Sequence, residues 1–201
     1  MRSQFANVHT GFRDPVHDSQ AVFRTVMHAM SRPALPVSLA TNVAPPQPLN
    51  ATAAAILITL ADFETTVWLD LPLASSEDVC QFASFHTGAR LVSNPGEAHF
   101  ALASTPKFLP RLAALSQGTP EYPDRSTTLI VQVVGFAASG LVLTGPGIKT
   151  VREFAFHDMP EGFERELMGN HAQFPCGVDI VLAAPAHVAA LPRSVRLVRE
   201  G

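Results

Sequence analysis

The amino-acid sequence predicts an α/β protein with a mixed β-sheet flanked by helices. Helical and strand patterns alternate in the first half of the chain, strands cluster in the second half, and the apolar run "VDIVLAAP" (178–185) is typical of a buried strand. A chain of 201 residues is long enough to bury a sizeable core. We therefore expect a single domain over residues 1–201, which begins with a polar N-terminal arm at residues 1–13.

The first predicted helix follows the arm. Asp18 can accept a hydrogen bond as its N-cap, and "SRP" (31–33) ends it. We expect one face of this helix to pack on the core, with Arg24 and His28 on the other side. The apolar residues that recur with helical spacing are Val22, Phe23, Val26, Met27 and Met30.

Two further helices are predicted in the first half of the chain. After a proline-rich loop at 40–50, Asn50 can cap an alanine-rich helix that runs through Leu60. "SSEDVCQFASFHTG" (75–88) combines a serine cap, an acidic first turn and a glycine stop. His86 and Thr87 therefore fall at a helix C-terminus.

The remaining elements are mostly strands. β-branched and aromatic residues, or apolar runs, predict them at 65–72, 98–103, 126–136, 140–145, 178–185, 187–191 and 194–198. Helices are predicted near Pro106 to Leu115 and within 159–170, and "GTPEYPD" (118–124) resembles a turn.

Composition and charge exclude several classes of function. The net charge is −3 and the 14 Lys and Arg residues are scattered, so we expect no nucleic-acid partner. The two cysteines, Cys80 and Cys176, favour a reducing compartment, and no apolar stretch is long enough for a signal peptide or a membrane span. We expect a cytoplasmic protein without membrane contact. Apolar residues at 47% against 15% charged also favour assembly with other chains.

The stretch "LTGPGIK" (143–149) raises the question of a phosphate-binding loop. A dinucleotide fingerprint needs a third glycine and a Walker loop needs G-x-x-x-x-G-K-[ST], and the sequence has neither. A tight turn, with glycines at positive φ, is the favoured interpretation. The alternative is a ligand-facing turn in which Thr144 and the backbone amides of Gly145 and Gly147 donate hydrogen bonds.

No catalytic or metal-binding residue is assigned. The eight histidines never show H-x-H or H-x-x-x-H spacing, so we expect no metal site. There is no G-x-S-x-G elbow, and Cys176 in "FPCGVD" has no base nearby in the sequence. The only lysines, Lys107 and Lys149, lack a context that favours Schiff-base chemistry, and we expect no cofactor.

Asp179 is the most distinctive carboxylate, because it opens an apolar run. An unpaired charge there would cost several kcal/mol. Asp179 should therefore have a partner, for which Arg193 in "LPRSV" is one candidate. We favour a structural ion pair or cap over a catalytic acid.

Several of these stretches together resemble the PhnH family, a subunit of the bacterial carbon–phosphorus lyase core complex. The resemblance runs from Asp14 to Val198. It rests on "PVHDSQAVFRTVMHAMSRPA", "LITLADFETTVWLD", "FHTGARLVSNPGEAHFAL", "LTGPGI" and "FPCGVDIVLA" with "ALPRS", in that order. No family pattern is recognised in "ATNVAPPQPLN" or "GTPEYPDRS".

The resemblance implies a role in phosphonate catabolism. In that pathway a phosphonate is joined to the ribose of a nucleoside triphosphate as the base leaves, which forms an alkylphosphonate ribose triphosphate, and a radical enzyme later cleaves the carbon–phosphorus bond. The family is known as a homodimer in isolation and as a component of a complex with PhnG, PhnI and PhnJ. Its fold is similar to the large domain of pyridoxal-phosphate-dependent transferases, without the cofactor.

Two hypotheses follow from these observations. The favoured one is a subunit that is part of an enzyme complex, is not catalytic alone and scaffolds its partners. The alternative is a ligand-binding or catalytic component with its own pocket for a phosphonate or nucleotide, near His86, Thr87, Thr144, Gly145 and Gly147. Together with Asp179 and Arg193, these five residues are the candidates for a ligand pocket or an interface.

Overall fold

The computed structural model describes residues 10–198 and contains a seven-stranded mixed sheet. Five neighbouring strands of this sheet run parallel, and two further strands follow at one edge, each antiparallel to its inner neighbour. This confirms the predicted α/β class. In spatial order the strands are β1 (Val37–Ser38), β9 (His187–Leu191), β8 (Asp179–Ala184), β5 (Thr128–Gln132), β4 (Phe100–Ala103), β2 (Thr66–Leu69) and β3 (Arg90–Val92).

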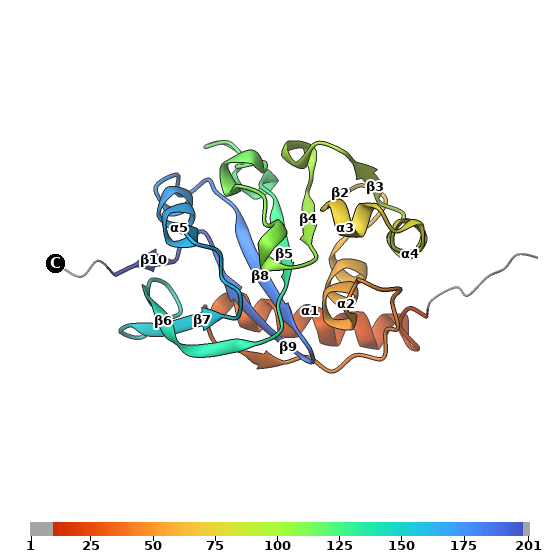
Figure 1. The fold of residues 1–201 in the computed structure, drawn as a ribbon, viewed down its shortest axis with the longest axis horizontal. Coiled ribbons are helices and arrows are strands. Elements are labelled where there is room, and N and C mark those ends of the chain that lie inside the picture. The colour runs from red at the N-terminus through yellow and green to blue at the C-terminus, as the bar shows by residue number, and fades with distance from the viewer. Residues whose placement is uncertain (1–9, 199–201) are drawn as a thin grey trace, which may run out of the picture.

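A second, three-stranded antiparallel sheet accompanies the main one. It has the order β10-β6-β7 and lies on the same side of the view as α5, whereas α2, α3 and α4 lie on the other side of the central strands (Figure 1). The strands are β6 (Phe136–Thr144), β7 (Arg152–Phe156) and β10 (Arg196–Leu197). The helices are α1 (Pro15–Ser31), α2 (Ala51–Leu60), α3 (Leu71–Ala74), α4 (Glu77–Thr87) and α5 (Phe163–His171).

The central strands are covered on both faces. Along β5, Ile130 belongs to a core that includes α1, α2 and α4, whereas its neighbours Leu129 and Val131 belong to a core that includes β6, β7 and α5. Because side chains alternate across a strand, each face contributes to its own core. This explains why the run at 178–185 is almost continuously apolar.

The predicted caps of α2 and α4 are confirmed. Asn50 accepts a hydrogen bond from the Ala53 amide at 2.7 Å, and Ser76 accepts one from the Val79 amide at 3.3 Å. Gly88 ends α4 in the left-handed conformation with φ of 71°. These ends are set by local hydrogen bonds, which is why the sequence alone located them.

The predicted start of the first helix is wrong by one turn. The N-cap is Asp14, which accepts from the His17 amide at 3.1 Å, and Pro15 occupies the first turn. Asp18 lies inside the helix, where its carboxylate accepts from the Asp14 amide and from Asn42.

The predicted core face of α1 is also only partly correct. Val22 and Val26 are buried, but Phe23 and Met27 remain 47% and 50% exposed. The apolar arc of the helix is wider than the surface that α2 and β9 cover. One strip of α1 therefore stays apolar and exposed.

The predicted helix near Pro106 to Leu115 is absent. The segment forms two short 3-10 turns, Pro106–Phe108 and Leu112–Ala114. Pro110 lies between them and lacks the amide hydrogen that a continuous helix needs. Strands β1, β3 and β7 were not predicted, because each is short or lies beside loop residues.

Candidate functional site

The predicted pairing of Asp179 with Arg193 is confirmed. The Arg193 Nε lies 3.1 Å from Oδ1 and 3.2 Å from Oδ2 of Asp179, and Nη2 donates to Oδ2. The two side chains are only 17% and 15% exposed. The Arg193 amide donates to the same carboxylate at 2.9 Å, and Nη1 donates to the carbonyls of Pro123 and Pro175. The pair thus joins the start of β8 to three loop segments, and its hydrogen bonds are directed to protein groups.

The "LTGPGIK" stretch forms the turn between β6 and β7. Gly145 and Gly147 have φ of 140° and 83°, and the Ile148 amide donates to the Gly145 carbonyl at 3.1 Å. The Thr144 hydroxyl donates to the Thr150 carbonyl at 3.2 Å. A Cβ on Gly147 would overlap the Ser31 carbonyl oxygen. These contacts confirm the tight-turn interpretation.

His86 and Thr87 lie at the C-terminus of α4, as predicted. The Thr87 hydroxyl donates to the Ala83 carbonyl at 2.7 Å and accepts from the Ala89 amide at 2.9 Å, so it caps its own helix. The His86 ring packs between Phe82 and Phe85, with centroid distances of 4.4 and 5.0 Å.

The structure does not bring these two groups of candidates together. The His86 ring lies against Gly11, just before α1, whereas Gly147 lies against Ser31 at the end of α1. A helix of 17 residues is about 25 Å long. A single small-molecule pocket lined by both the His86–Thr87 pair and the glycine turn is therefore not formed.

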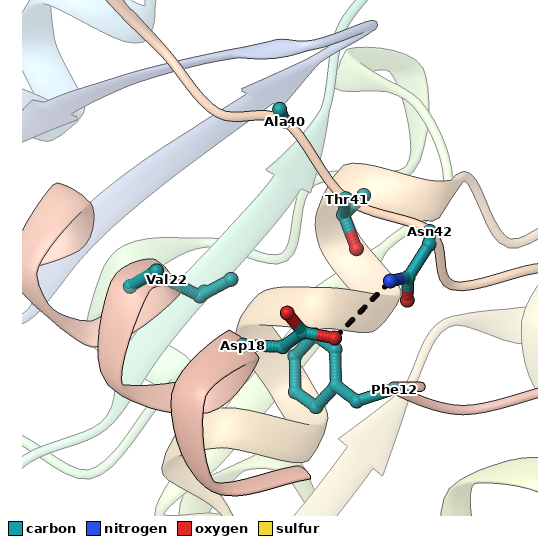
Figure 2. Close-up of a pocket in the computed structure, with 7 residues that line it drawn as sticks. Phe12, Asp18, Val22, Ala40, Thr41 and Asn42 are labelled. Carbon is teal, nitrogen blue, oxygen red and sulfur yellow. Dashed lines mark hydrogen bonds between the residues drawn. The ribbon is translucent and has the colours of Figure 1, made fainter. Parts of the chain in front are cut away.

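One groove of about 330 Å³ lies beside the N-terminal half of α1. Asp18 and Val22 of α1 face Ala40, Thr41 and Asn42 across it, with the Phe12 ring alongside (Figure 2). Its main polar groups bind each other, since Asn42 donates to the Asp18 carboxylate at 3.1 Å.

The Asp14 carboxyl lies one turn before Asp18. Hydrogen bonds from the His17 amide and ring hold the pKa of Asp14 below its ordinary value. This carboxylate is thereby committed to the start of α1.

A second groove, of about 410 Å³, lies between residues 106–112 and residues 160–166. We call it the basic groove, because three cations line it: Lys107, Arg111 and Arg165. Two carboxylates, Glu161 and Glu166, also line it. Sequence reasoning missed this groove, because its residues belong to separate segments and match no motif.

Among the three cations of the basic groove, Arg111 is the one with a carboxylate within salt-bridge distance in the described part of the chain. Its Nε lies 3.5 Å from Oε1 of Glu166, whose Oε2 accepts from the Leu112 amide at 2.8 Å. Within residues 10–198, Lys107 and Arg165 form no salt bridge.

Cys80 does not lie in a reactive arrangement. The Cys80 thiol donates weakly to the Ala74 carbonyl at 3.5 Å, and burial, with a smaller effect from Glu77, raises the pKa of that thiol.

Over the described part of the chain there is no group of three His, Cys, Asp or Glu residues able to hold a metal ion. No helix among residues 10–198 is long and apolar enough to span a membrane.

The fold and these surfaces define the class of protein. It is an α/β protein whose mixed sheet is buried on both faces. Its first helix, which packs on one of the two cores, carries an exposed apolar strip, and the basic groove lies beside the other core. The chain belongs to the PhnH family, described as bacterial phosphonate metabolism protein (PhnH), which matches residues 10–198.

Two relatives extend this assignment. The chain is 40% identical over 190 residues to the alpha-D-ribose 1-methylphosphonate 5-triphosphate synthase subunit PhnH of Rhizobium meliloti (strain 1021), and the match covers 94% of each chain. It is 30% identical over 186 residues to HtxG of Stutzerimonas stutzeri, described as a C-P lyase subunit protein, covering 90% of this chain and 87% of the relative.

Proposed function

We propose that the protein is a non-catalytic scaffold subunit of an assembly that couples a phosphonate to the ribose of a nucleoside triphosphate. The product would be an alkylphosphonate ribose triphosphate. The observation that carries the proposal is the 40% identity to a named synthase subunit over 94% of both chains. The partners would be PhnG, PhnI and PhnJ, with a homodimer in isolation, in the cytoplasm.

The exposed strip of α1 supports a scaffold role. Val16, Phe23 and Met27 are 73%, 47% and 50% exposed, and they recur on one side of the helix. Exposed apolar strips of this kind mark protein–protein contacts. The strip therefore offers a surface for another chain.

Co-expression with the partner subunits tests the proposal. The tagged protein should co-purify with them, and base release from a nucleoside triphosphate in the presence of methylphosphonate should require it. A Phe23→Ser and Met27→Ser double variant should lose partner or self-association, while Arg24→Ser on the same helix should keep it. Assembly and activity of the other subunits without this protein would refute the scaffold role.

The second candidate function is a ligand-binding component. The wide separation of His86 from Gly147 disfavours the predicted shared pocket, but the basic groove is a different concave surface with cationic groups. We further propose that the fold resembles the large domain of pyridoxal-phosphate-dependent transferases and that the protein takes no cofactor. Superposition of the strand order on such a transferase tests the first point, and the absorbance spectrum of the purified protein tests the second.

A further inference from the structure

We propose that the basic groove binds a linear triphosphate group. This inference rests on the proposed function for the choice of ligand, since a synthase of that kind handles a triphosphate throughout. None of the candidate residues predicted from the sequence lines this groove. The site is formed by the Lys107–Arg111 segment on one side and the Glu161–Glu166 segment on the other.

Arg111 provides the directional part of the site. Its Nε faces Glu166, and Glu166 is itself fixed by the Leu112 amide. The two terminal nitrogens of Arg111 form no hydrogen bond with any other residue among 10–198, and the side chain is 83% exposed. A guanidinium with one edge near a carboxylate and the other edge open to solvent can make bidentate contact with phosphate oxygens.

Lys107 and Arg165 provide the remaining positive charge. Lys107 has only a distant ring contact, with Nζ 6.0 Å from the centroid of Phe108, and neither cation has a carboxylate partner among the described residues. The chain has 14 Lys and Arg residues and a net charge of −3, so three cations around one groove are a local reversal of its overall charge. Such a concave cationic surface attracts anions.

The volume of the groove favours a small polyanion over an acidic protein segment. At about 410 Å³ it lies at the lower end of the range for small-molecule sites. Glu161 and Glu166 also line it, so the ligand must place several negative charges close together to overcome their repulsion. A triphosphate chain does so within a few bond lengths, whereas a peptide carries its carboxylates on separate side chains.

Calorimetric titration of the full-length protein with sodium tripolyphosphate at low salt tests the inference. We expect one binding site per chain, and the affinity for tripolyphosphate should fall when salt is added. Lys107→Gln, Arg111→Gln and Arg165→Gln should each weaken binding by about tenfold. Matched controls are Lys149→Gln and Arg90→Gln, which remove exposed cations outside the groove and should leave the affinity unchanged.

Further measurements complete the experiment. ATP should bind at least as well as tripolyphosphate, and adenosine should not bind. Absence of tripolyphosphate binding at millimolar concentration, both by the protein alone and by its co-purified complex, would overturn the inference. Equal loss of affinity in the control variants would also overturn it, as would binding of a poly-glutamate peptide in place of tripolyphosphate. Co-purification of the groove variants with the partner subunits separates this outcome from failure of the scaffold role.

Discussion

Two regions of the molecule each combine an arginine–carboxylate pair with a positive-φ glycine, yet they differ in packing. In the first, Asp179 and Arg193 are 17% and 15% exposed, and the nearby turn places Gly145 against Ser194. In the second region, the basic groove, Arg111 pairs with Glu166 and its side chain is 83% exposed. The glycine of this region is Gly162, with φ of 80°.

The difference shows that the same chemical pair serves different purposes at different burial. Asp179 and Arg193 are largely removed from water and direct their hydrogen bonds to each other and to nearby carbonyls, so loss of one leaves the other uncompensated. Arg111 is solvated and contributes little to folding, which leaves it available to a ligand. We call the first region the packed corner.

Substitution of two glycines with similar φ should give the largest contrast, one in the turn between β6 and β7 that also holds Gly145 and one in the basic groove. Gly147 and Gly162 have similar φ of 83° and 80°, but a Cβ on Gly147 would overlap the Ser31 carbonyl, whereas nothing lies within 4 Å of one on Gly162. Gly147→Ala should lower the free energy of unfolding by about 4 kcal/mol, from backbone strain and overpacking. Gly162→Ala should lower it by about 1 kcal/mol, from strain alone. Urea unfolding midpoints at unchanged slope measure both, and equal losses would contradict the contrast.

Removal of the packed corner's cation should have the next largest effect. Arg193→Ala leaves the largely buried Asp179 carboxylate without its charged partner and should cost about 3 kcal/mol of unfolding free energy. Arg193→Lys keeps the charge but loses the planar fork, so an intermediate value is expected. A stability for Arg193→Ala close to that of the wild type would show that the pair does not clamp the loops.

The corresponding change in the basic groove should have the smallest effect on stability. Arg111→Gln breaks an exposed pair and should cost less than about 1 kcal/mol. Urea unfolding of Arg111→Gln measures this change in stability, and the titration with tripolyphosphate measures the change in affinity of the same variant. A loss of unfolding free energy as large as that of Arg193→Ala would mean that Arg111 has a structural role and is not available to bind a ligand.

Prediction from the sequence succeeded where local hydrogen bonds decide the outcome. Asn50 and Ser76 cap their helices as predicted, and Gly88 ends α4, because each interaction lies within a few residues of the chain. It failed at Asp18, because Asp14 caps the helix one turn earlier, and near Pro110, because the proline interrupts the predicted helix.

For the candidate site, the sequence identified chemistry but not proximity. The pairing of Asp179 with Arg193 was predictable, since a carboxylate at the start of a buried strand requires a partner. The distance between His86 and Gly147 was not, because it depends on where α1 lies between them. The basic groove was equally hidden, since residues 106–112 and 160–166 become neighbours only through the fold.

The sequence by itself determined the α/β class, the ends of α2 and α4 and the PhnH family, because these depend on short-range periodicity, capping and ordered motifs. Only the tertiary structure decided which apolar face of α1 stays exposed, that the two predicted ligand motifs lie apart, and that three dispersed cations surround one groove. The physical reason is that packing brings together residues far apart in the chain, and no local pattern records which segments will meet.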